Sequence, residues 1–269
     1  MFGDPILRHI LTPNNPAVKL LSTASDTTDL TTYTFSAMDI GGFGDSHPFG
    51  SDQANTTTSA LLSSPGRAAI ACIVHGEDAA TTFGVSSVTI GGVAGTEAVD
   101  RGGGTSAINT AIYIWTGESL RGIANTDVVV VWNEAVTSCA VGIIEITNLT
   151  CYAALASGSA QGTGAVNAPI INLADSSRFS GGIAIFGSSC VTGGGTETPE
   201  FNLIAGTTQP LDAMNPTLLY HGNNAELDFA AAFSLVTGTF HDPISTVRLG
   251  ASVSWSGTGA GDLVGIYLA

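Results

Sequence analysis

Hydrophobic positions along the chain come in short runs or alternate with polar ones, and no long segment keeps the spacing of an amphipathic helix. Lys, Glu and Gln, which are common on helix surfaces, are scarce. The runs are bounded by Gly, Asn, Asp, Pro and Ser at fairly regular intervals. The pattern predicts an all-β protein, an antiparallel β-sandwich that is jelly-roll-like. The expected strands cover residues 18–22, 31–38, 68–75, 87–90, 93–99, 107–116, 128–133, 140–147, 169–173, 182–187, 201–205, 217–220, 228–236, 246–255 and 262–268.

Two glycines interrupt the apolar stretch "SVTIGGVAGTEAV" (residues 87–99). A phosphate-binding loop would place a helix after the glycines, usually with a Gly-Lys-Ser/Thr sequence, and neither follows here. Gly91 and Gly92 instead predict a two-residue hairpin turn, because such turns need positive φ angles. The clusters at 102–104 and 193–195 are expected to form loops.

The segment 128–147, "VVVVWNEAVTSCAVGIIEIT", reads as two adjacent strands joined by a short loop at 134–138. Its continuous apolar runs favour central strands that are covered on both faces, whereas "ASVSWS" at 251–256 alternates and favours one face in water. A second set of strands at 182–268 resembles the first set in length and order. Because no residue-level repeat relates them, two sheets of one sandwich are preferred over duplicated domains.

The first residues, "MFGDPILRHILTPNNP", differ from the rest of the chain. An apolar face opened by an Asp-Pro pair would suit a short helix. We therefore expect residues 1–16 to form an N-terminal arm and residues 17–269 to form a single β-sandwich domain. The arm either packs as strand or coil on its own domain or docks into a neighbouring subunit. The side chains proposed for docking are Phe2, Ile6, Leu7, Ile10 and Leu11.

The charge balance excludes several classes of partner. The net charge is −15, only 11% of the residues are charged, and the seven basic residues are scattered. Nucleic acids and anionic membranes attract clustered cations, so we expect neither nucleic-acid binding nor membrane insertion. A neutral surface rich in Gly, Ser and Thr is instead typical of β-proteins that cover themselves with partners. No apolar run is long enough to span a membrane and no signal segment is recognisable, so synthesis in the cytoplasm is expected.

Candidate chemistry is sparse. Cys72, Cys139, Cys151 and Cys190 lack CxxC spacing and are expected to be buried free thiols rather than a disulfide framework or a metal site. The five histidines form no metal-binding pair, and no GxSxG elbow is present. We therefore expect no catalytic site, no metal and no cofactor.

Three weaker possibilities remain from the residue types alone. "HGED" at 75–78 combines a histidine with two carboxyl groups at a strand end, although a solvated loop is the commoner outcome. Carboxyl pairs for glycoside hydrolysis and a sugar-stacking Trp132 beside Glu134 are conceivable, but tryptophans in strands usually pack in cores. The acidic candidates are Glu97, Glu118, Glu134 and Glu145.

Several segments in order resemble one group of proteins. They are "YTFSAMDIG" (33–41), "RAAIACIVHGE" (67–77), "SSVTIGGVAGTEAV" (86–99), "AIYIWTG" (111–117), "DVVVVWNEAVTSCAVGIIEITN" (127–148) and "GGIAIFG" (181–187). Together they resemble tailed-bacteriophage and prophage virion β-sandwich proteins, over about residues 31–187, with a weaker likeness at "ASVSW". The resemblance implies a fold and a virion setting, and it transfers no site residues. The arm at 1–16 departs from the group's usual short start.

The expected function is that of a bacteriophage virion structural protein without enzymatic activity. A head decoration or accessory protein acting by protein–protein adhesion is preferred, with a tail fibre or receptor-binding module that recognises host-surface glycans as the alternative. The expected partners are other virion proteins, such as capsid or tail subunits, and copies of the chain itself.

Overall fold

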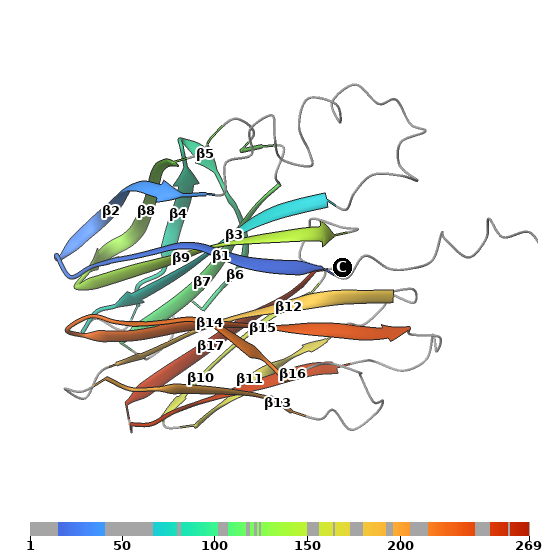
Figure 1. Ribbon diagram of the computed structural model, residues 1–269. Helices are drawn as coiled ribbons and strands as arrows, with labels where there is room; N and C mark the ends of the chain where they lie inside the picture. Colours follow the sequence, from blue (N-terminus) through green and yellow to red (C-terminus); the bar gives the residue numbers. More distant parts are fainter. Residues whose placement is uncertain are drawn as a thin grey trace, which may run out of the picture.

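The computed structural model describes most of the chain as β-structure (Figure 1). The described residues are 16–40, 67–79, 82–101, 107–116, 119–120, 123, 125–149, 156–163, 165–172, 180–191, 196–204, 215–239, 248–257 and 259–268. All neighbouring strands among them pair antiparallel. The predicted all-β, antiparallel sandwich class is confirmed. The predicted arm at 1–16, with Phe2, Ile6, Leu7, Ile10 and Leu11, lies almost entirely outside the described residues.

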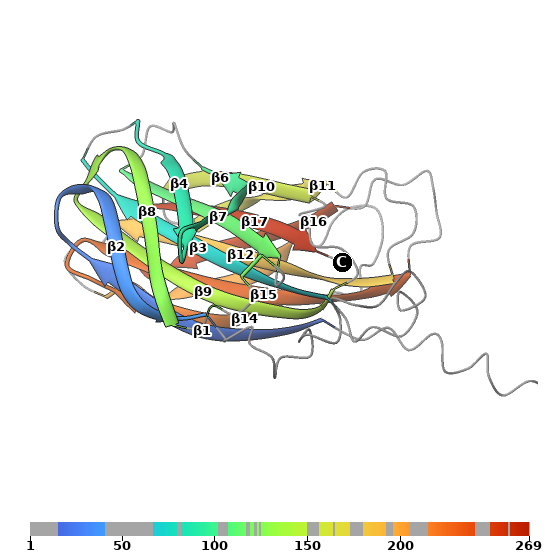
Figure 2. The same cartoon turned by 90° about the horizontal axis from the view of Figure 1, so that it is seen from above.

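The N-terminal half forms two sheets. The inner N sheet has the spatial order β1 (Ala17–Asp26), β9 (Ser138–Leu149), β3 (Arg67–Glu77), β7 (Ile108–Thr116) and β6 (Thr96–Asp100), and the outer N sheet has the order β2 (Leu30–Asp39), β8 (Asn125–Val136), β4 (Val85–Ile90) and β5 (Val93–Ala94). Seen from above, the outer strands β2, β8 and β4 cross the inner strands at an angle (Figure 2).

The C-terminal half also forms two sheets. The inner C sheet has the order β10 (Ala156–Thr163), β17 (Ala260–Leu268), β12 (Ser180–Val191), β15 (Leu227–Thr239) and β14 (Thr217–Asn223), and the outer C sheet has the order β11 (Ala165–Asn172), β16 (Arg248–Trp255) and β13 (Pro199–Ile204).

The strand order of the first half is repeated in the second. Replacing β1, β9, β3, β7 and β6 by β10, β17, β12, β15 and β14 converts one inner sheet into the other, and β2, β8 and β4 correspond to β11, β16 and β13. Within the described residues, β5 has no counterpart. Each half is a jelly roll, and the four sheets are stacked in the order outer N, inner N, inner C and outer C (Figure 1). Two sheets were expected, so the described chain has a more layered arrangement than one simple sandwich.

Three hydrophobic cores separate the four sheets. One lies inside each jelly roll, and the third lies between the two inner sheets. Alternation along β3 shows how one strand serves two cores: Ile70, Cys72 and Val74 face the first core, whereas Ala71 and Ile73 face the middle one. This double covering is why central inner strands such as β3, β7, β9 and β17 are buried along both faces, whereas the edge strands β1 and β14 are partly exposed. That residues 17–269 form a single domain stays a prediction.

The glycine hairpin is confirmed. Ile90 pairs with Val93 across Gly91 and Gly92, whose φ angles are +56° and +80°. These values suit glycine and strain other residues, as the turn argument requires. The predicted strand 93–99 is wrong as one element, because the chain leaves the outer sheet after β5 and enters the inner sheet as β6. The break falls at Gly95, where a Cβ would overlap the Trp115 ring.

Two further expectations change. The stretch 156–163, where the sequence predicts no strand, is strand β10, which pairs with β17 along its whole length. The expectation that both strands of 128–147 are covered on both faces is right for β9 and wrong for β8, because β8 lies in the outer sheet. Val129 and Val131 are only half-buried there, while Val130 is buried. The loop between these strands is shorter than expected, with Thr137 alone outside them.

Candidate functional site: a buried polar seam between the two jelly rolls

Five polar side chains form a continuous chain of hydrogen bonds at one end of the middle core. They are Tyr220 on β14, His75 on β3, Ser189 on β12, Thr110 on β7 and Asp262 on β17, and we call them the polar seam. Tyr220 Oη lies 2.9 Å from His75 Nε2, His75 Nδ1 lies 3.0 Å from Ser189 Oγ, and Ser189 Oγ lies 2.6 Å from Thr110 Oγ1. Thr110 Oγ1 donates to Asp262 Oδ1 at 2.7 Å. The seam therefore links the two jelly rolls with polar contacts inside an apolar layer.

The donor and the acceptor of every hydrogen bond in the seam follow from the bond between Thr110 and Asp262. Because the single Thr110 proton goes to Asp262, Ser189 must donate to Thr110. Ser189 then needs a proton from His75 Nδ1, which leaves Nε2 to accept from the Tyr220 hydroxyl. This arrangement fixes a neutral His75 in its Nδ1–H tautomer. It also satisfies both ring nitrogens, which a buried histidine needs.

Burial perturbs the two titratable ends of this chain in opposite senses. Desolvation lowers the pKa of His75 from 6.5 to about 3, which keeps the ring neutral. Desolvation raises the pKa of Asp262 from 3.8 to about 7, although hydrogen bonds from Thr110 and the Ser189 N–H and the charge of Arg101 favour the ionised form. Both groups are fully buried, so solvent would not screen a charge on either side chain.

Two glycines let the jelly rolls approach closely beside the seam. At Gly142 on β9 a Cβ would overlap the ring of Tyr220, so the ring occupies the space that a side chain would take. At Gly187 on β12 a Cβ would lie 2.6 Å from Ile73 Cγ2 on the opposite sheet. Both glycines therefore serve close packing rather than backbone flexibility.

Further contacts join the β14–β15 turn to the ends of strands β3 and β9. The pKa of Glu77, at the end of β3, is raised first by partial burial and also by the neighbouring Glu226 carboxyl group, while its hydrogen bond from Thr137 opposes the shift. Asn224 Nδ2 donates to Ser138 Oγ at 2.7 Å. The β14–β15 turn of one jelly roll is thus fastened to the β3 and β9 ends of the other.

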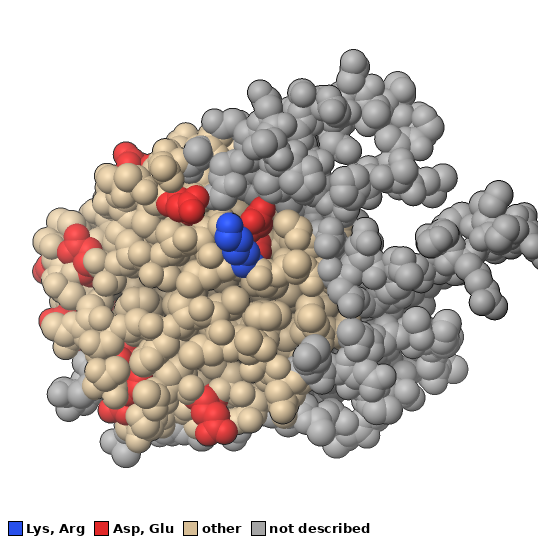
Figure 3. Space-filling view, viewed as in Figure 1, with Lys and Arg blue, Asp and Glu red and all other residues tan. Residues whose placement is uncertain are grey.

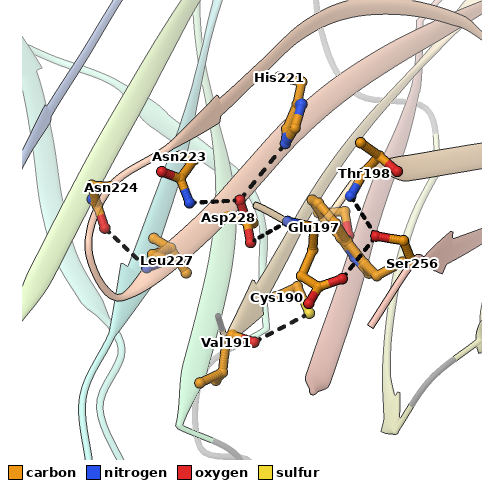
Figure 4. Close-up of polar contacts among 12 residues, drawn as sticks. Cys190, Val191, Glu197, Thr198, His221, Asn223, Asn224, Leu227, Asp228 and Ser256 are labelled. Carbon is orange, nitrogen blue, oxygen red and sulfur yellow. Dashed lines mark hydrogen bonds and ion pairs between the residues drawn. The ribbon is translucent and has the colours of Figure 1, made fainter. Parts of the chain in front are cut away.

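A further buried acid organises the C-terminal jelly roll (Figure 4). Asp228 on β15 accepts from Asn223 Nδ2 at 3.0 Å and from the Glu197 N–H at 2.9 Å, and His221 Nε2 lies 3.8 Å from its Oδ1. Ser256 Oγ donates to Glu197 Oε2 at 2.8 Å. These contacts tie the segment before β13 to the β14–β15 hairpin and the end of β16, and they give both oxygens of the buried carboxyl group a hydrogen-bond donor.

The sequence candidates are placed apart rather than together. Of residues 75–78, only His75 enters the polar seam, whereas Glu77 faces Glu226. Glu134 is exposed on β8 of the outer sheet and Glu145 is nearly buried on β9 of the inner sheet, so they do not share a face. Glu97 on β6 accepts a hydrogen bond from Tyr113, and Glu118 lies outside the described residues.

The aromatic and thiol expectations are confirmed where the structure describes them. Trp115, Trp132 and Trp255 are buried, and Trp132 packs in the first core against Phe83 rather than presenting a face to sugars. Three cysteines are free and buried, and burial raises their pKa values, to about 12 for Cys190. Cys151 lies outside the described part. The three described thiols are Cys72, Cys139 and Cys190.

The seam holds the residue types of a nucleophilic site, but its geometry serves packing. Ser189 contacts His75, and an aspartate is within two hydrogen bonds, yet all three side chains are inaccessible to solvent. A substrate could not reach the hydroxyl without separating the jelly rolls. Among the described residues, His, Cys, Asp and Glu nowhere gather as three ligands able to hold a metal ion. Within that same part of the chain, no helix is long and apolar enough to cross a membrane.

On the face that Figure 3 shows, the described residues carry few charged side chains, most of them acidic, and wide uncharged areas separate them. Two large apolar side chains are exposed, Leu30 on β2 by 39% and Leu218 on β14 by 49%. The exposed face of β2 is otherwise rich in threonine and serine. The exposed residues of β2 are thus mostly polar and uncharged, as the composition predicts.

Comparison with known proteins adds little to this description. No protein-family model matches the sequence, and no curated protein matches it significantly. Among solved structures, a chain titled "Cucumber Leaf Spot Virus" aligns over 94% of this chain and 91% of its own length, with 10% identity and a TM-score of 0.17. An alignment with so low a TM-score carries no argument about fold or function.

Proposed function

We propose that this chain is a bacteriophage virion structural protein, a head decoration or accessory protein that acts by protein–protein adhesion. Its partners would be capsid or tail subunits and further copies of itself, and it would be made in the host cytoplasm before joining the virion. The proposal assigns it no enzymatic role and no cofactor.

The observation that carries the proposal is the pair of jelly rolls fused through a shared core. Jelly rolls are used repeatedly in viral capsid and lectin domains, where rigid sheets present loops and edges to partners. Here a third core and the polar seam hold two such units in one fixed arrangement. A rigid double unit can contact neighbours on several sides, which suits a lattice component.

The surface supports the same role. Only 11% of the residues are charged, so wide parts of the surface can meet a partner without burying a charge. Neutral threonine and serine side chains on an exposed sheet can form hydrogen bonds with a partner without a large desolvation cost. Adhesion over wide, uncharged areas is therefore the mode of binding that this surface favours.

The decisive experiment locates the protein on purified particles. Mass analysis of disrupted virions and immunogold labelling of intact ones should find the chain on heads in many symmetric copies. Absence from particles would refute the virion proposal. Labelling confined to tails would refute the head assignment and leave the tail-fibre alternative.

That alternative, a tail-fibre or receptor-binding module for host-surface glycans, is kept because jelly rolls also occur in lectins. A glycan array probed with the isolated chain distinguishes the two functions. Specific, competable glycan binding would favour the receptor-binding module, whereas the adhesive role predicts none.

The arm hypothesis has its own test. A chain lacking residues 1–16 should fold as the full chain does but be incorporated poorly into particles, because its docking side chains are gone. Normal incorporation of the truncated chain would remove the arm from the mechanism. Replacing only Ile6 and Leu7 by Ser provides a milder control with the same arm length.

A further inference from the structure

Three polar side chains meet beside the polar seam, at the edge where β6 and β10 lie next to each other. Arg101 directly follows β6 in the N-terminal jelly roll, and its backbone N–H donates to Thr110 O at 3.1 Å. Gln161 on β10 is the cross-strand partner of Asp262 on β17. Because directly opposite residues of an antiparallel pair project on the same face, Gln161 and Asp262 lie side by side. Arg101 Nη2 donates to Gln161 Oε1 at 2.8 Å, which brings all three side chains together.

Each of these side chains has one buried polar atom without a hydrogen-bond partner. The atoms are Arg101 Nε, Gln161 Nε2 and Asp262 Oδ2. Asp262 is fully buried, so its second oxygen has no direct access to solvent. An unsatisfied buried polar atom destabilises a fold, so three in one place call for a shared partner. The charge of Arg101 reaches Asp262 without a direct hydrogen bond between Nε and Oδ2.

The chemistry of the three atoms specifies that partner. Arg101 Nε and Gln161 Nε2 can only donate, and Asp262 Oδ2 only accepts while its carboxyl group is ionised. A ligand must therefore accept two hydrogen bonds and donate one, which is what a hydroxyl-bearing oxygen does. A cation would face the guanidinium of Arg101, and an anion would face the carboxylate of Asp262, so a neutral ligand fits best. Buried water molecules commonly make about three hydrogen bonds to such groups.

We propose that Arg101, Gln161 and Asp262 form a binding site for one buried water molecule that bridges the two jelly rolls. The water accepts from the arginine of the N-terminal jelly roll and the glutamine of the C-terminal one, and donates to the aspartate. It extends the hydrogen-bonded chain of the polar seam to the β6–β10 edge. The site does not depend on the virion role, so its test is independent of that proposal.

A crystal structure of the full chain at high resolution tests the site directly. We expect an oxygen peak within about 2.7–3.2 Å of Arg101 Nε, Gln161 Nε2 and Asp262 Oδ2. A direct Arg101–Asp262 hydrogen bond with no peak between the side chains would overturn the proposal. So would side-chain positions that leave no room for a water.

A variant with a solution readout provides a second test. Gln161→Met keeps the length of the side chain and removes both amide donors, and the exposed neighbour Ser159→Ala is the matched control on the same strand. Water relaxation dispersion of the unaltered chain should detect a long-lived internal water that Gln161→Met loses and Ser159→Ala keeps. An unchanged signal in Gln161→Met, with the protein folded by circular dichroism, would refute the role of Gln161.

Discussion

The opposite pKa shifts of His75 and Asp262 predict that each hides the other's effect on stability. Neutral His75 is favoured in the folded state, because its pKa falls from 6.5 to about 3. Protonation therefore favours unfolding in this window, and stability rises as the pH increases from about 3 to about 6.5. The folded state also favours protonated Asp262, because its pKa rises from 3.8 to about 7, so stability falls as the pH increases from about 4 to about 7. The two trends oppose each other over almost the same range.

The magnitude follows from the overlap of the two windows. A group that binds one proton in only one state changes the free energy of unfolding by about 1.4 kcal/mol per pH unit. Between about pH 4 and 6.5 each group alone therefore contributes roughly 3 kcal/mol, with opposite signs. In the unaltered chain these contributions nearly cancel. Asp262→Asn removes the contribution of Asp262, which decreases as the pH rises. The free energy of unfolding of this variant should therefore increase by roughly 3 kcal/mol from about pH 4 to 6.5.

Urea unfolding at several pH values measures this directly, with the slope against pH as the readout rather than the absolute stability. His75→Gln should show the reverse trend, a stability that falls as the pH rises from 4 to 6.5. Asp127→Asn, the same chemical change at an exposed position of β8, serves as the control and should follow the unaltered chain. If Asp262→Asn and His75→Gln both keep the pH profile of the unaltered chain, the reasoning about burial is wrong.

Three further predictions concern packing, the acidic pair and the turn. Gly142→Ala should destabilise the chain by about 1–3 kcal/mol in chemical denaturation, because the new methyl group overlaps the Tyr220 ring; a loss below about 0.5 kcal/mol would contradict the close packing. Glu226→Gln should lower the pKa of Glu77 in an NMR titration, since it removes a neighbouring negative charge, and an unchanged pKa would show that burial alone causes the shift. Gly91→Ala should cost about 1–2 kcal/mol because its φ is +56°, whereas Gly91→Asn should cost less, and equal stability of all three chains would refute the strained-turn interpretation.

The strands that sequence predicts well are those with β-branched residues and clear boundaries. The β4–β5 hairpin is an example, because two glycines separate alternating Val, Thr and Ile. Strand β10 escapes prediction because "ASGSAQGT" consists of small and polar residues, which carry no hydrophobic period. Its pairing with β17 supplies the order that its own side chains do not. The burial of β8 also escapes, because a run of valines looks alike in an outer and an inner sheet.

The similarity between the two halves cannot be seen in the residue identities, because it lies in the order in which the strands are connected. Strands β3 and β12 occupy equivalent central places, yet "RAAIACIVHGE" and "SGGIAIFGSSCV" share little beyond small and apolar residues. A jelly roll constrains which positions are apolar and leaves the choice among apolar side chains open. Strand order can therefore repeat while residue identities do not.

The polar seam was only partly foreseeable. The strand-end His75 is a visible candidate, but its partners Ser189 and Tyr220 lie 114 and 145 residues further along the chain. The available signal is a polar residue at an inward position of an otherwise apolar strand, as with Asp262 before "LVGIYL" and Thr110 before "AIYIW". That signal identifies buried polar groups, but it does not say which of them meet.

The shared middle core has a consequence for the chain during its synthesis. When the ribosome has completed β9, the inner N sheet lacks the sheet that covers its second face, and isoleucines such as Ile112 and Ile144 stay uncovered. Synthesis of the roughly 120 residues up to the end of β17 takes on the order of 6–24 s at 5–20 residues per second. Throughout that interval the second face of the inner N sheet remains an exposed apolar surface. A nascent-chain chaperone or a neighbouring nascent chain can bind this surface before the second half of the same chain has been synthesised.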